Sequence, residues 1–271
     1  MSLIESEGRS VVSEYQAEGA AGLVLLRHGE STANAAERFT GRWDVTLSPG
    51  GVRQAAVAAG LLHDSKWRPG IVFSSPLQRA TRTADLVLDV LHPSGGRPVI
   101  HADAELTERG YGVLTGMRKS RVRTEFGAEL AHSWRRSLSV RPPTRGELNR
   151  THPAPGWDGA PGQGPPAAVL EISESLTDVL ARIDRWLDEA LHPALALRMR
   201  VLVVAHGNSL RALIMRLDHL SEEQVSQLNV PTGQPLAYDV DGCGVVPGSG
   251  RYLDPEAAAA AARAVAEEGG T

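Results

Sequence analysis

Residues 22–29 read Gly-Leu-Val-Leu-Leu-Arg-His-Gly, an apolar run that ends abruptly at an arginine and a histidine. A short continuous apolar run is typical of a strand that a parallel sheet buries on both faces. A matching stretch lies far along the chain, where residues 201–207 read Val-Leu-Val-Val-Ala-His-Gly. The two stretches predict two buried strands, each followed directly by histidine and glycine.

Strand-like and helix-like segments alternate around these two stretches. Ser48 and Pro49 are suited to begin a helix, as its cap and its first residue. Further segments continue the alternation: strands over 71–73 and 98–100, and helices over 77–91, 173–191 and 210–217. Strand followed by helix, repeated, indicates a parallel sheet flanked by helices. We therefore expect an α/β protein with three layers, α/β/α, in which helices cover both faces of a mostly parallel central sheet.

The length and composition indicate a single folded domain. A chain of 271 residues, 42% hydrophobic and 22% charged, can bury one sizeable core. We expect a flexible arm over residues 1–20, one catalytic domain over 21–245 and an alanine-rich tail over 246–271. Prolines and glycines crowd residues 142–168, which indicates a long surface excursion rather than a linker.

Composition also argues against several classes of partner and site. A net charge of -4 disfavours a nucleic-acid partner, which would need a basic face. Cys243 is the one cysteine, so the chain holds neither an intramolecular disulfide nor a multi-cysteine metal site, and no His/Asp/Glu spacing suggests a metal. The first twenty residues do not resemble a signal peptide, and no apolar stretch approaches the ~18 residues that span a bilayer. We expect a cytoplasmic protein with no membrane partner.

The two histidines point to one functional site. In open parallel sheets the ligand crevice lies beyond the carboxyl ends of the strands, which places His28 and His206 at the same rim. Gly29 and Gly207 let the backbone turn sharply there and approach a ligand closely. Either histidine alone would fit a structural role at a strand end equally well. The repetition of the pattern favours a site.

The residues around this rim suit phosphoryl transfer. A neutral imidazole is a workable nucleophile at pH 7. Phosphoryl transfer needs positioning and positive charge around the moving group, which Arg27 and Arg79 would supply. Glu108 offers the proton handler that the attacking or leaving hydroxyl requires. Arginine also binds phosphate or carboxylate through paired hydrogen bonds, although Arg135 and Arg136 taken alone would fit a solvated helix face better.

The chain resembles the histidine phosphatase superfamily, in its 2,3-bisphosphoglycerate-dependent phosphoglycerate mutase branch. The resemblance covers residues 22–240 in order. It is carried by Arg27-His28-Gly29-Glu30-Ser31-x-x-Asn34, Arg38-Phe39-Thr40-Gly41, Ser74-Ser75-Pro76-Leu77-x-Arg79-Ala80, Glu108-Arg109-x-Tyr111-Gly112, Lys119, Trp134-Arg135-Arg136-Ser137, Glu174-Ser175-Leu176, Ala205-His206-Gly207-Asn208 and Leu228-Asn229-Val230-Pro231-Thr232-Gly233.

The resemblance implies a role for each of these residues. His28 would carry the phosphoryl group, His206 would stabilise it in transit and Glu108 would be the general acid and base. The groups around the phosphoryl site would be Arg27, Asn34, Thr40, Gly41, Arg79 and Asn208. The substrate's carboxylate and second phosphate would be held by Tyr111, Lys119, Arg135 and Arg136. Neighbouring residues of the same motifs would complete the substrate site: Gly29, Glu30, Ser31, Arg109 and Gly207.

The resemblance also implies a reaction and a quaternary state. In this family 2,3-bisphosphoglycerate primes the histidine, and the enzyme then interconverts 2- and 3-phosphoglycerate without a metal, in glycolysis and gluconeogenesis. The substrate would be a small phosphorylated three-carbon acid. Relatives are usually dimers or tetramers, so we expect a homodimer or homotetramer.

The chain departs from the family pattern on the substrate side of the site. Glycine stands at Gly110 where histidine is usual, Thr107 replaces an asparagine, Arg42-Trp43 shifts the usual tryptophan, and 143–173 lacks an acidic, tyrosine-containing stretch. A missing side chain at Gly110 would admit water beside Glu108. Water that intercepts a phosphoenzyme makes a phosphatase. A phosphatase paralogue is therefore the first alternative to a mutase, and a non-catalytic binder of phosphorylated ligands is the second.

Overall fold

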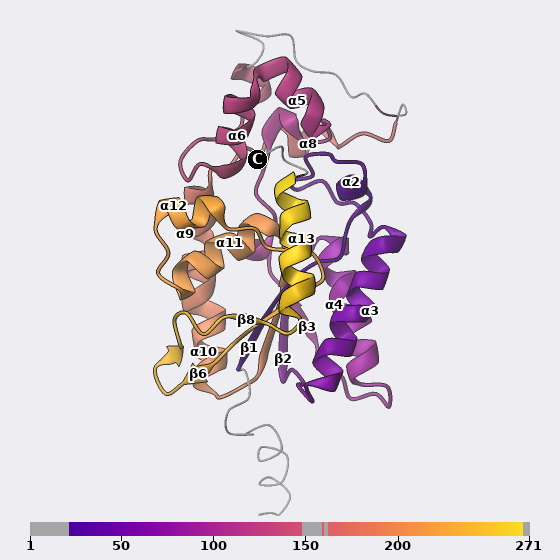
Figure 1. Ribbon diagram of the computed structural model, residues 1–271, viewed down its shortest axis with the longest axis vertical. Coiled ribbons are helices and arrows are strands. Elements are labelled where there is room, and N and C mark those ends of the chain that lie inside the picture. Colours follow the sequence, from indigo (N-terminus) through magenta and orange to yellow (C-terminus); the bar gives the residue numbers. More distant parts are fainter. Residues whose placement is uncertain (1–21, 148–158, 160–161, 268–271) are drawn as a thin grey trace, which may run out of the picture.

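The central sheet organises the computed structural model, which describes residues 22–147, 159 and 162–267 (Figure 1). Six strands form this sheet in the order β3-β2-β4-β1-β5-β8. The flexible arm expected over residues 1–20 lies outside the described residues, as does much of the proline-rich excursion. The predicted three-layer α/β/α architecture with a mostly parallel sheet is confirmed.

Parallel and antiparallel strands occupy different parts of the sheet. The parallel strands are β1 (Leu23–Arg27), β2 (Ile71–Ser74), β3 (Ile100–Ala102) and β4 (Val201–Ala205). At one edge β5 (Pro235–Tyr238) pairs antiparallel with β1, and β8 (Arg251–Tyr252) pairs antiparallel with β5. The strands β6 (Val240–Asp241) and β7 (Gly244–Val245) form a separate hairpin. The strand expected over 98–100 begins two residues later, beyond Pro98, which has no N–H to donate to a neighbouring strand.

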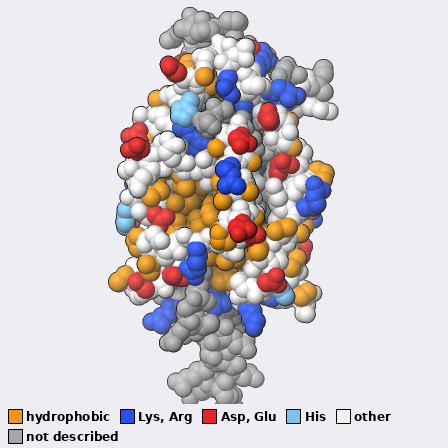
Figure 2. All heavy atoms as spheres, viewed as in Figure 1, with side chains coloured by type: hydrophobic (Ala, Val, Ile, Leu, Met, Phe, Trp, Pro, Cys, Tyr) orange, Lys and Arg blue, Asp and Glu red, His pale blue; other side chains and the backbone are white. Residues whose placement is uncertain are grey.

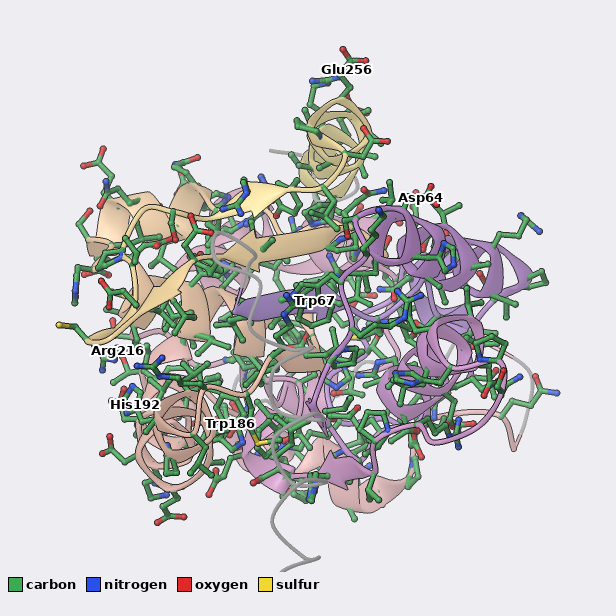
Figure 3. All side chains as sticks on the ribbon, turned by 90° about the horizontal axis from the view of Figure 1, so that it is seen from below. Asp64, Trp67, Trp186, His192, Arg216 and Glu256 are labelled. Carbon is green, nitrogen blue, oxygen red and sulfur yellow. The ribbon has the colours of Figure 1, made fainter. Side chains whose placement is uncertain are left out.

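Two helices, α3 (Pro49–Asp64) and α4 (Gln78–Leu91), cover one face of the sheet. Ser48 caps α3 as predicted, because its Oγ accepts from Gly51 N at 3.0 Å. Alternate side chains of the buried strands point to this face and pack against the two helices: Val24, Leu26, Val72, Leu202 and Val204. Trp67 closes this layer, and Figure 3 shows it between the strands and these helices.

The other face is covered by helices from later in the chain. They are α9 (Leu176–Trp186), which continues through the π-helical turn η3 (Leu187–Leu191) into α10 (His192–Ala196), and α11 (Gly207–Leu217). The intervening strand positions pack here, among them Leu23, Leu25, Val201 and Val203, together with Trp186 (Figure 3). The helix expected over 173–191 begins at Leu176, because Ser175 caps it by accepting from Asp178 N.

A small cap of further elements stands over the carboxyl ends of the strands (Figure 1). It contains α2 (Thr32–Ala35), η1 (Ala104–Leu106), η2 (Gly112–Leu114), α5 (Lys119–Phe126), α6 (Ala128–Arg136) and α8 (Ala167–Leu170). Its own apolar core joins Phe39, Val113, Leu114, Met117, Val122, Ala131 and Trp134. This cap places the basic residues of α5 and α6 above the rim of the sheet.

The remaining helices are α12 (Glu222–Gln227) and α13 (Pro255–Glu267). Residues 246–267 of the expected tail contain β8, which pairs with β5, and α13, which runs beside the sheet toward the cap (Figure 1). Hydrophobic side chains gather in the middle of this face, next to α13 (Figure 2), and Ala258 is buried there. Within the described ranges, every helix is too short or too polar to cross a bilayer.

Candidate active site

The two histidines that follow β1 and β4 lie side by side. These strands are neighbours with Arg27 opposite Ala205, and His28 N donates to Ala205 O at 3.0 Å. The imidazole rings of His28 and His206 are therefore adjacent, with centroids 4.9 Å apart and planes at 64°. Both side chains are buried, 3% and 0% exposed. The structure brings together the two residues on which the sequence argument depends.

His28 is held in one tautomer. Its Nδ1 lies 2.6 Å from Gly29 O, which can only accept, so Nδ1 carries the proton and Nε2 keeps its lone pair. Arg79 Nε donates to that Nε2 at 3.2 Å. Burial, followed by the charges of Arg79 and Arg27, holds the pKa of His28 well below its usual value of 6.5. The ring is therefore a neutral nucleophile at pH 7.

Arg79 links the nucleophile to the loop that follows α2. From the first turn of α4 its Nη1 donates to Trp43 O at 2.8 Å and its Nη2 donates to Gly41 O at 2.9 Å. Burial lowers the pKa of Arg79 to about 10, which leaves the guanidinium charged at pH 7. All three of its nitrogens are fixed, so a positive charge is oriented beside Nε2 of His28 before any ligand arrives.

His206 is ready to receive a ligand. Among the described residues neither ring nitrogen has a hydrogen-bond partner, although the side chain is fully buried. Burial, followed by the charge of Arg79, holds its pKa well below 6.5. Buried polar groups are rarely left unsatisfied, and those that are call for a ligand or a catalytic role. A phosphoryl oxygen beside His28 would satisfy the donor nitrogen of this ring.

Glu108 approaches the histidines from the segment after η1. Its Oε1 accepts from Arg109 N at 2.7 Å and from Asn208 N at 3.2 Å, at the start of α11. These two contacts fix the position of the carboxyl group at the start of α11. The side chain is 8% exposed and reaches the same cavity as His28. A carboxyl group that can donate or accept a proton therefore lines the same cavity as His28.

One cavity collects most of the predicted site residues. Those that line it are Arg27, His28, Asn34, Thr40, Gly41, Arg79, Glu108, Tyr111, Lys119, Arg135, Arg136, Gly207 and Asn208. Arginine, lysine and amide donors dominate this lining, so the cavity suits a small ligand that carries several negative charges.

A second group of basic residues lines the cavity from the cap. Arg136 donates to Leu228 O at 3.1 Å and to Asn229 Oδ1 at 2.5 Å, and burial lowers its pKa to about 10. Tyr111 OH accepts from Asn208 Nδ2 at 3.1 Å. Burial acts to raise the pKa of Tyr111, but the charge of Arg109 and the other nearby arginines outweighs burial and lowers it.

The other predicted binding residues support the loop beneath His28 and do not line the cavity. The carboxylate of Glu30 accepts from Ser48 Oγ at 2.5 Å. Ser31 caps α2, and Gly29 N donates to Thr83 Oγ1 at 3.1 Å. Gly29 must lack a side chain, because a Cβ there would lie 2.2 Å from Gly51 O. These residues interact with protein groups, so the structure gives them a supporting position.

Arg109 also lies behind the cavity wall. Its guanidinium stacks over the ring of Tyr111 at 4.7 Å from the centroid, and Nη2 donates to Trp134 O at 2.6 Å. It therefore positions Tyr111 and the end of α6.

Several cavity residues were not predicted from the sequence. They are Arg38, Phe39, Arg211, Leu228, Asn229, Val230 and Val265. Most lie inside the quoted motifs, which could have identified them. Arg211, from the second turn of α11, donates to Asn208 Oδ1 at 3.0 Å, and burial lowers its pKa to about 9. Val265 belongs to α13, whose alanine-rich pattern gave no sign of reaching the site.

The surroundings of Gly110 contradict the expectation that its missing side chain leaves room for water. A Cβ at Gly110 would lie 2.4 Å from Ile172 O and 2.7 Å from Ile172 Cγ2. The main chain of Ile172 therefore fills the space that a side chain would take. The extra room for water beside Glu108, expected from the missing side chain, does not exist at this position.

The described residues contain no group of three or more histidine, cysteine, aspartate or glutamate side chains that could hold a metal ion. The charged side chains that line the cavity are those of arginine, lysine and Glu108.

Sequence comparison finds the same pattern in known proteins. The family model of the histidine phosphatase superfamily (branch 1) matches residues 23–153 and 150–246. A 2,3-bisphosphoglycerate-dependent phosphoglycerate mutase of Cutibacterium acnes is 42% identical over 248 residues, covering 91% of this chain and 98% of the relative. The protein of the same name from Rhodococcus opacus is 41% identical over 252 residues, covering 92% and 96%.

Structural comparison finds the same fold in solved structures. A mycobacterial glucosyl-3-phosphoglycerate phosphatase has a TM-score of 0.60 and 25% identity, covering 86% of this chain and 97% of that one. An α-ribazole-5'-P phosphatase from Escherichia coli described as putative also has a TM-score of 0.60, at 23% identity, covering 85% and 96%. The second likeness concerns the fold alone.

Proposed function

The chain belongs to the histidine phosphatase superfamily (branch 1), and from this premise we propose that it is a 2,3-bisphosphoglycerate-dependent phosphoglycerate mutase. The observation that carries the proposal is the distribution of charge in the cavity. Arg27 and Arg79 stand beside the nucleophile His28, while Lys119 and Arg136 line the same cavity from the cap. A simple phosphatase needs only the first group, whereas a substrate with two anionic ends uses both.

The residues present fit a bisphosphorylated three-carbon acid. The His206 ring, whose nitrogens are unpartnered among the described residues, lies beside His28, and Arg79 donates to His28 Nε2, so both residues stand next to the phosphoryl position proposed at His28. The cap supplies the charges for the other end: Tyr111, Lys119, Arg135 and Arg136. When bound, 2,3-bisphosphoglycerate supplies the phosphoryl group that primes His28.

Each group has a proposed task in the transfer. The Nε2 lone pair of His28 attacks phosphorus while the ester P–O bond breaks, and the protonated carboxyl of Glu108 donates its proton to the leaving oxygen. Arg27, Arg79 and His206 balance the charge on the phosphoryl oxygens in flight. In the return step the carboxylate of Glu108 takes the proton from an attacking hydroxyl, and the P–N bond breaks.

A coupled assay tests this function directly. With 3-phosphoglycerate as substrate we expect 2-phosphoglycerate to form, at a rate that rises steeply when trace 2,3-bisphosphoglycerate is added. Release of inorganic phosphate should remain a minor reaction. Hydrolysis alone, or no turnover, would contradict the mutase assignment.

A phosphatase that acts on a small phosphorylated acid is the second candidate. Its support is the structural likeness to the mycobacterial glucosyl-3-phosphoglycerate phosphatase. Phosphate release from a panel of phosphorylated acids, unaffected by 2,3-bisphosphoglycerate, would favour it. Strict dependence on 2,3-bisphosphoglycerate would exclude it.

The family resemblance also supports a homodimer or homotetramer in the cytoplasm. Light scattering on the purified chain measures the first property, and a monomer at micromolar concentration would contradict it. Fractionation of the source cells tests the second.

A further inference from the structure

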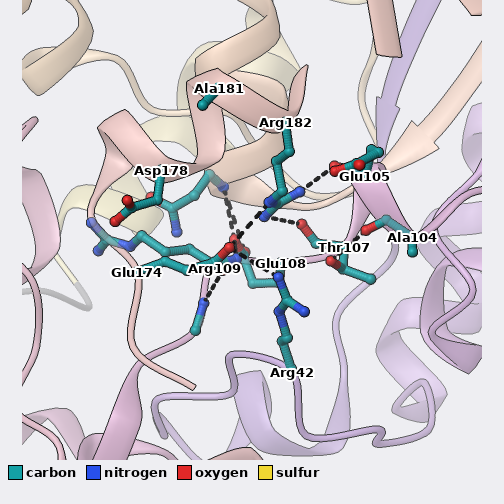
Figure 4. Close-up of polar contacts among 12 residues, drawn as sticks. Arg42, Ala104, Glu105, Thr107, Glu108, Arg109, Glu174, Asp178, Ala181 and Arg182 are labelled. Atoms are coloured by element: carbon teal, nitrogen blue, oxygen red, sulfur yellow. Dashed lines mark hydrogen bonds and ion pairs between the residues drawn. The ribbon is translucent and has the colours of Figure 1, made fainter. Parts of the chain in front are cut away.

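A partly buried ion cluster lies next to the segment that carries Glu108 (Figure 4), and its residues do not line the cavity. The carboxylate of Glu174 accepts from Gly110 N at 2.8 Å, from Arg42 Nη2 at 2.9 Å and from Arg182 Nε at 3.3 Å. We call Arg42, Gly110, Glu174 and Arg182 the Glu174 cluster. Its members come from three segments, the loop after α2, the stretch after η1 and α9 with the residue before its cap, so it joins parts of the chain that are far apart in sequence.

The cluster holds the main chain on both sides of Glu108. Arg182 donates from Nη1 to Glu105 O and from Nη2 to Thr107 O, the latter at 2.7 Å (Figure 4). Glu174 binds Gly110 N, two residues after Glu108. Glu108 therefore sits on a short segment that is fixed just before it by Arg182 and just after it by Glu174.

Main-chain hydrogen bonds also fix the part of this segment that leads toward the cavity. Glu174 N donates to Gly110 O at 3.0 Å, and Gly112 N donates to Ile172 O at 2.9 Å. This two-stranded contact encloses Tyr111, which lines the cavity. Displacement of Glu174 would thus loosen both the proposed proton handler and a proposed substrate contact.

Arg42 connects the same carboxylate to the nucleophile. It follows Gly41, whose carbonyl accepts from Arg79 Nη2, and Arg79 in turn donates to Nε2 of His28. A continuous chain of contacts therefore runs from Glu174 to the nucleophile on one side and to Glu108 on the other. The distance between these two reacting groups depends on it.

Burial distinguishes the cluster from the ion pairs on the surface. The side chains of Glu174 and Arg182 are 13% and 5% exposed. By contrast Arg185, one turn from Arg182 on α9, is 58% exposed in its pair with Glu105. Removing one partner of a buried pair leaves the other charge uncompensated, so the surrounding structure must shift. Removing an exposed pair changes little.

We propose that Glu174 is the positioning residue for Glu108, fixing it relative to His28 and sealing the wall behind it against water. The inference rests on the proposed mutase function, since it concerns the proton step of that reaction. Neutralising Glu174 leaves the charges of Arg42 and Arg182 uncompensated, shifts the segment around Glu108 and lets water compete for the phosphohistidine.

The test is Glu174→Gln, which keeps the size of the side chain and its acceptor for Gly110 N but removes its charge. A displacement of about 1 Å at a reacting group can cost about 100-fold in rate, so we expect kcat to fall by about 10–100-fold with KM within about threefold of wild type. The fraction of phosphoryl groups lost to water should rise, and the pH dependence of kcat should shift. Phosphate labelling of His28 should persist.

The matched control is Arg185→Gln, which removes the exposed pair on the same helix and should leave all five readouts unchanged. Arg42→Gln, at the less buried end of the cluster, should give a smaller change in the same direction, and it replaces Glu174→Gln as the test if that variant does not fold.

Wild-type kcat and an unchanged pH profile in a folded Glu174→Gln or Arg42→Gln variant would overturn the proposal. Equal losses in all rates without increased hydrolysis would overturn it too. If the wild type proves to be a hydrolase, the mutase function fails, and the same variants measured by phosphate release still decide the positioning role.

Discussion

Arg79 donates from Nε to Nε2 of His28 at 3.2 Å, while its other two nitrogens bind the carbonyls of Gly41 and Trp43. The nucleophilic lone pair is thus already directed by a cation whose position is fixed by main chain. An incoming phosphoryl group needs only to replace one hydrogen bond, because the charge that stabilises it is in place.

Arg79→Lys should slow phosphorylation of His28 by about 100-fold, because one ammonium cannot satisfy three acceptors in the plane of the guanidinium. Rapid-quench measurement of acid-labile phosphate on the protein gives the rate. Arg82→Lys, on the exposed side of α4, is the control and should behave as wild type. A rate for Arg79→Lys within a few-fold of wild type would show that the guanidinium and its three hydrogen bonds are not required.

His28→Ala should abolish acid-labile labelling by radioactive 2,3-bisphosphoglycerate and lower turnover by roughly 10⁴-fold or more, because no other nucleophile would replace Nε2. His63→Ala, an exposed histidine on α3, should label normally. A stable label on the wild type also excludes a protein that only binds phosphorylated ligands. Label that survives in His28→Ala would place the phosphoryl group elsewhere.

Stability should fall as the pH drops below 6.5, because the folded state keeps His28 and His206 neutral while the unfolded state protonates them. Above pH 6.5 both states hold these rings neutral, so this contribution is constant there. Below it each histidine lowers the free energy of unfolding by up to about 1.4 kcal/mol per pH unit. Urea unfolding between pH 7.5 and 5.5 measures the slope. The double variant His28→Gln, His206→Gln should show a flatter slope, and an equal slope would refute the assignment.

Gly110→Ala should destabilise the protein by about 1–3 kcal/mol, because its Cβ would overlap the main chain of Ile172. Activity should fall with it, since Gly110 is two residues from Glu108. Gly60→Ala is the matched control: a Cβ there meets nothing within 4 Å, and α3 should gain about 0.5–1 kcal/mol. Thermal unfolding of both variants decides the point, and a neutral Gly110→Ala would mean that Ile172 moves freely.

Lys119→Met should raise KM for 3-phosphoglycerate by about 10-fold, because one charge-assisted contact to the second anionic group is lost. Phosphorylation of His28 by saturating 2,3-bisphosphoglycerate should change much less. Lys66→Met, at the other lysine of the chain and on the exposed surface, should leave KM as it is. An unchanged KM in Lys119→Met would move the second anion site away from α5.

Local patterns were enough to predict the frame of the fold. The apolar runs before His28 and His206 predicted β1 and β4, and Ser48-Pro49 predicted the start of α3. Each of these signals depends on residues close in sequence. The small errors, such as the later start of α9 at Leu176, fall at element ends, where the cap decides the boundary.

The Glu174 cluster and the filling of Gly110 by Ile172 could not be predicted in the same way. Both need contacts between segments that lie far apart in the chain, and a pattern in one segment does not specify its partner. The family resemblance led to a wrong expectation at Gly110, namely extra room for water beside Glu108. A missing side chain leaves a void only when no other segment fills the space. Val265 reaches the cavity for a similar reason: its position depends on where β8 directs α13.

The order of strands in the sheet has a consequence for protein synthesis. β1 leaves the ribosome before the other strands, yet its two neighbours, β4 and β5, are made near the end of translation. Its hydrogen-bonding edges must stay open until then, and closing so long a loop is slow. A growing chain that stops short of β4 carries His28 without His206. An unfinished polypeptide therefore cannot transfer or hydrolyse the phosphoryl groups on which the finished enzyme would act.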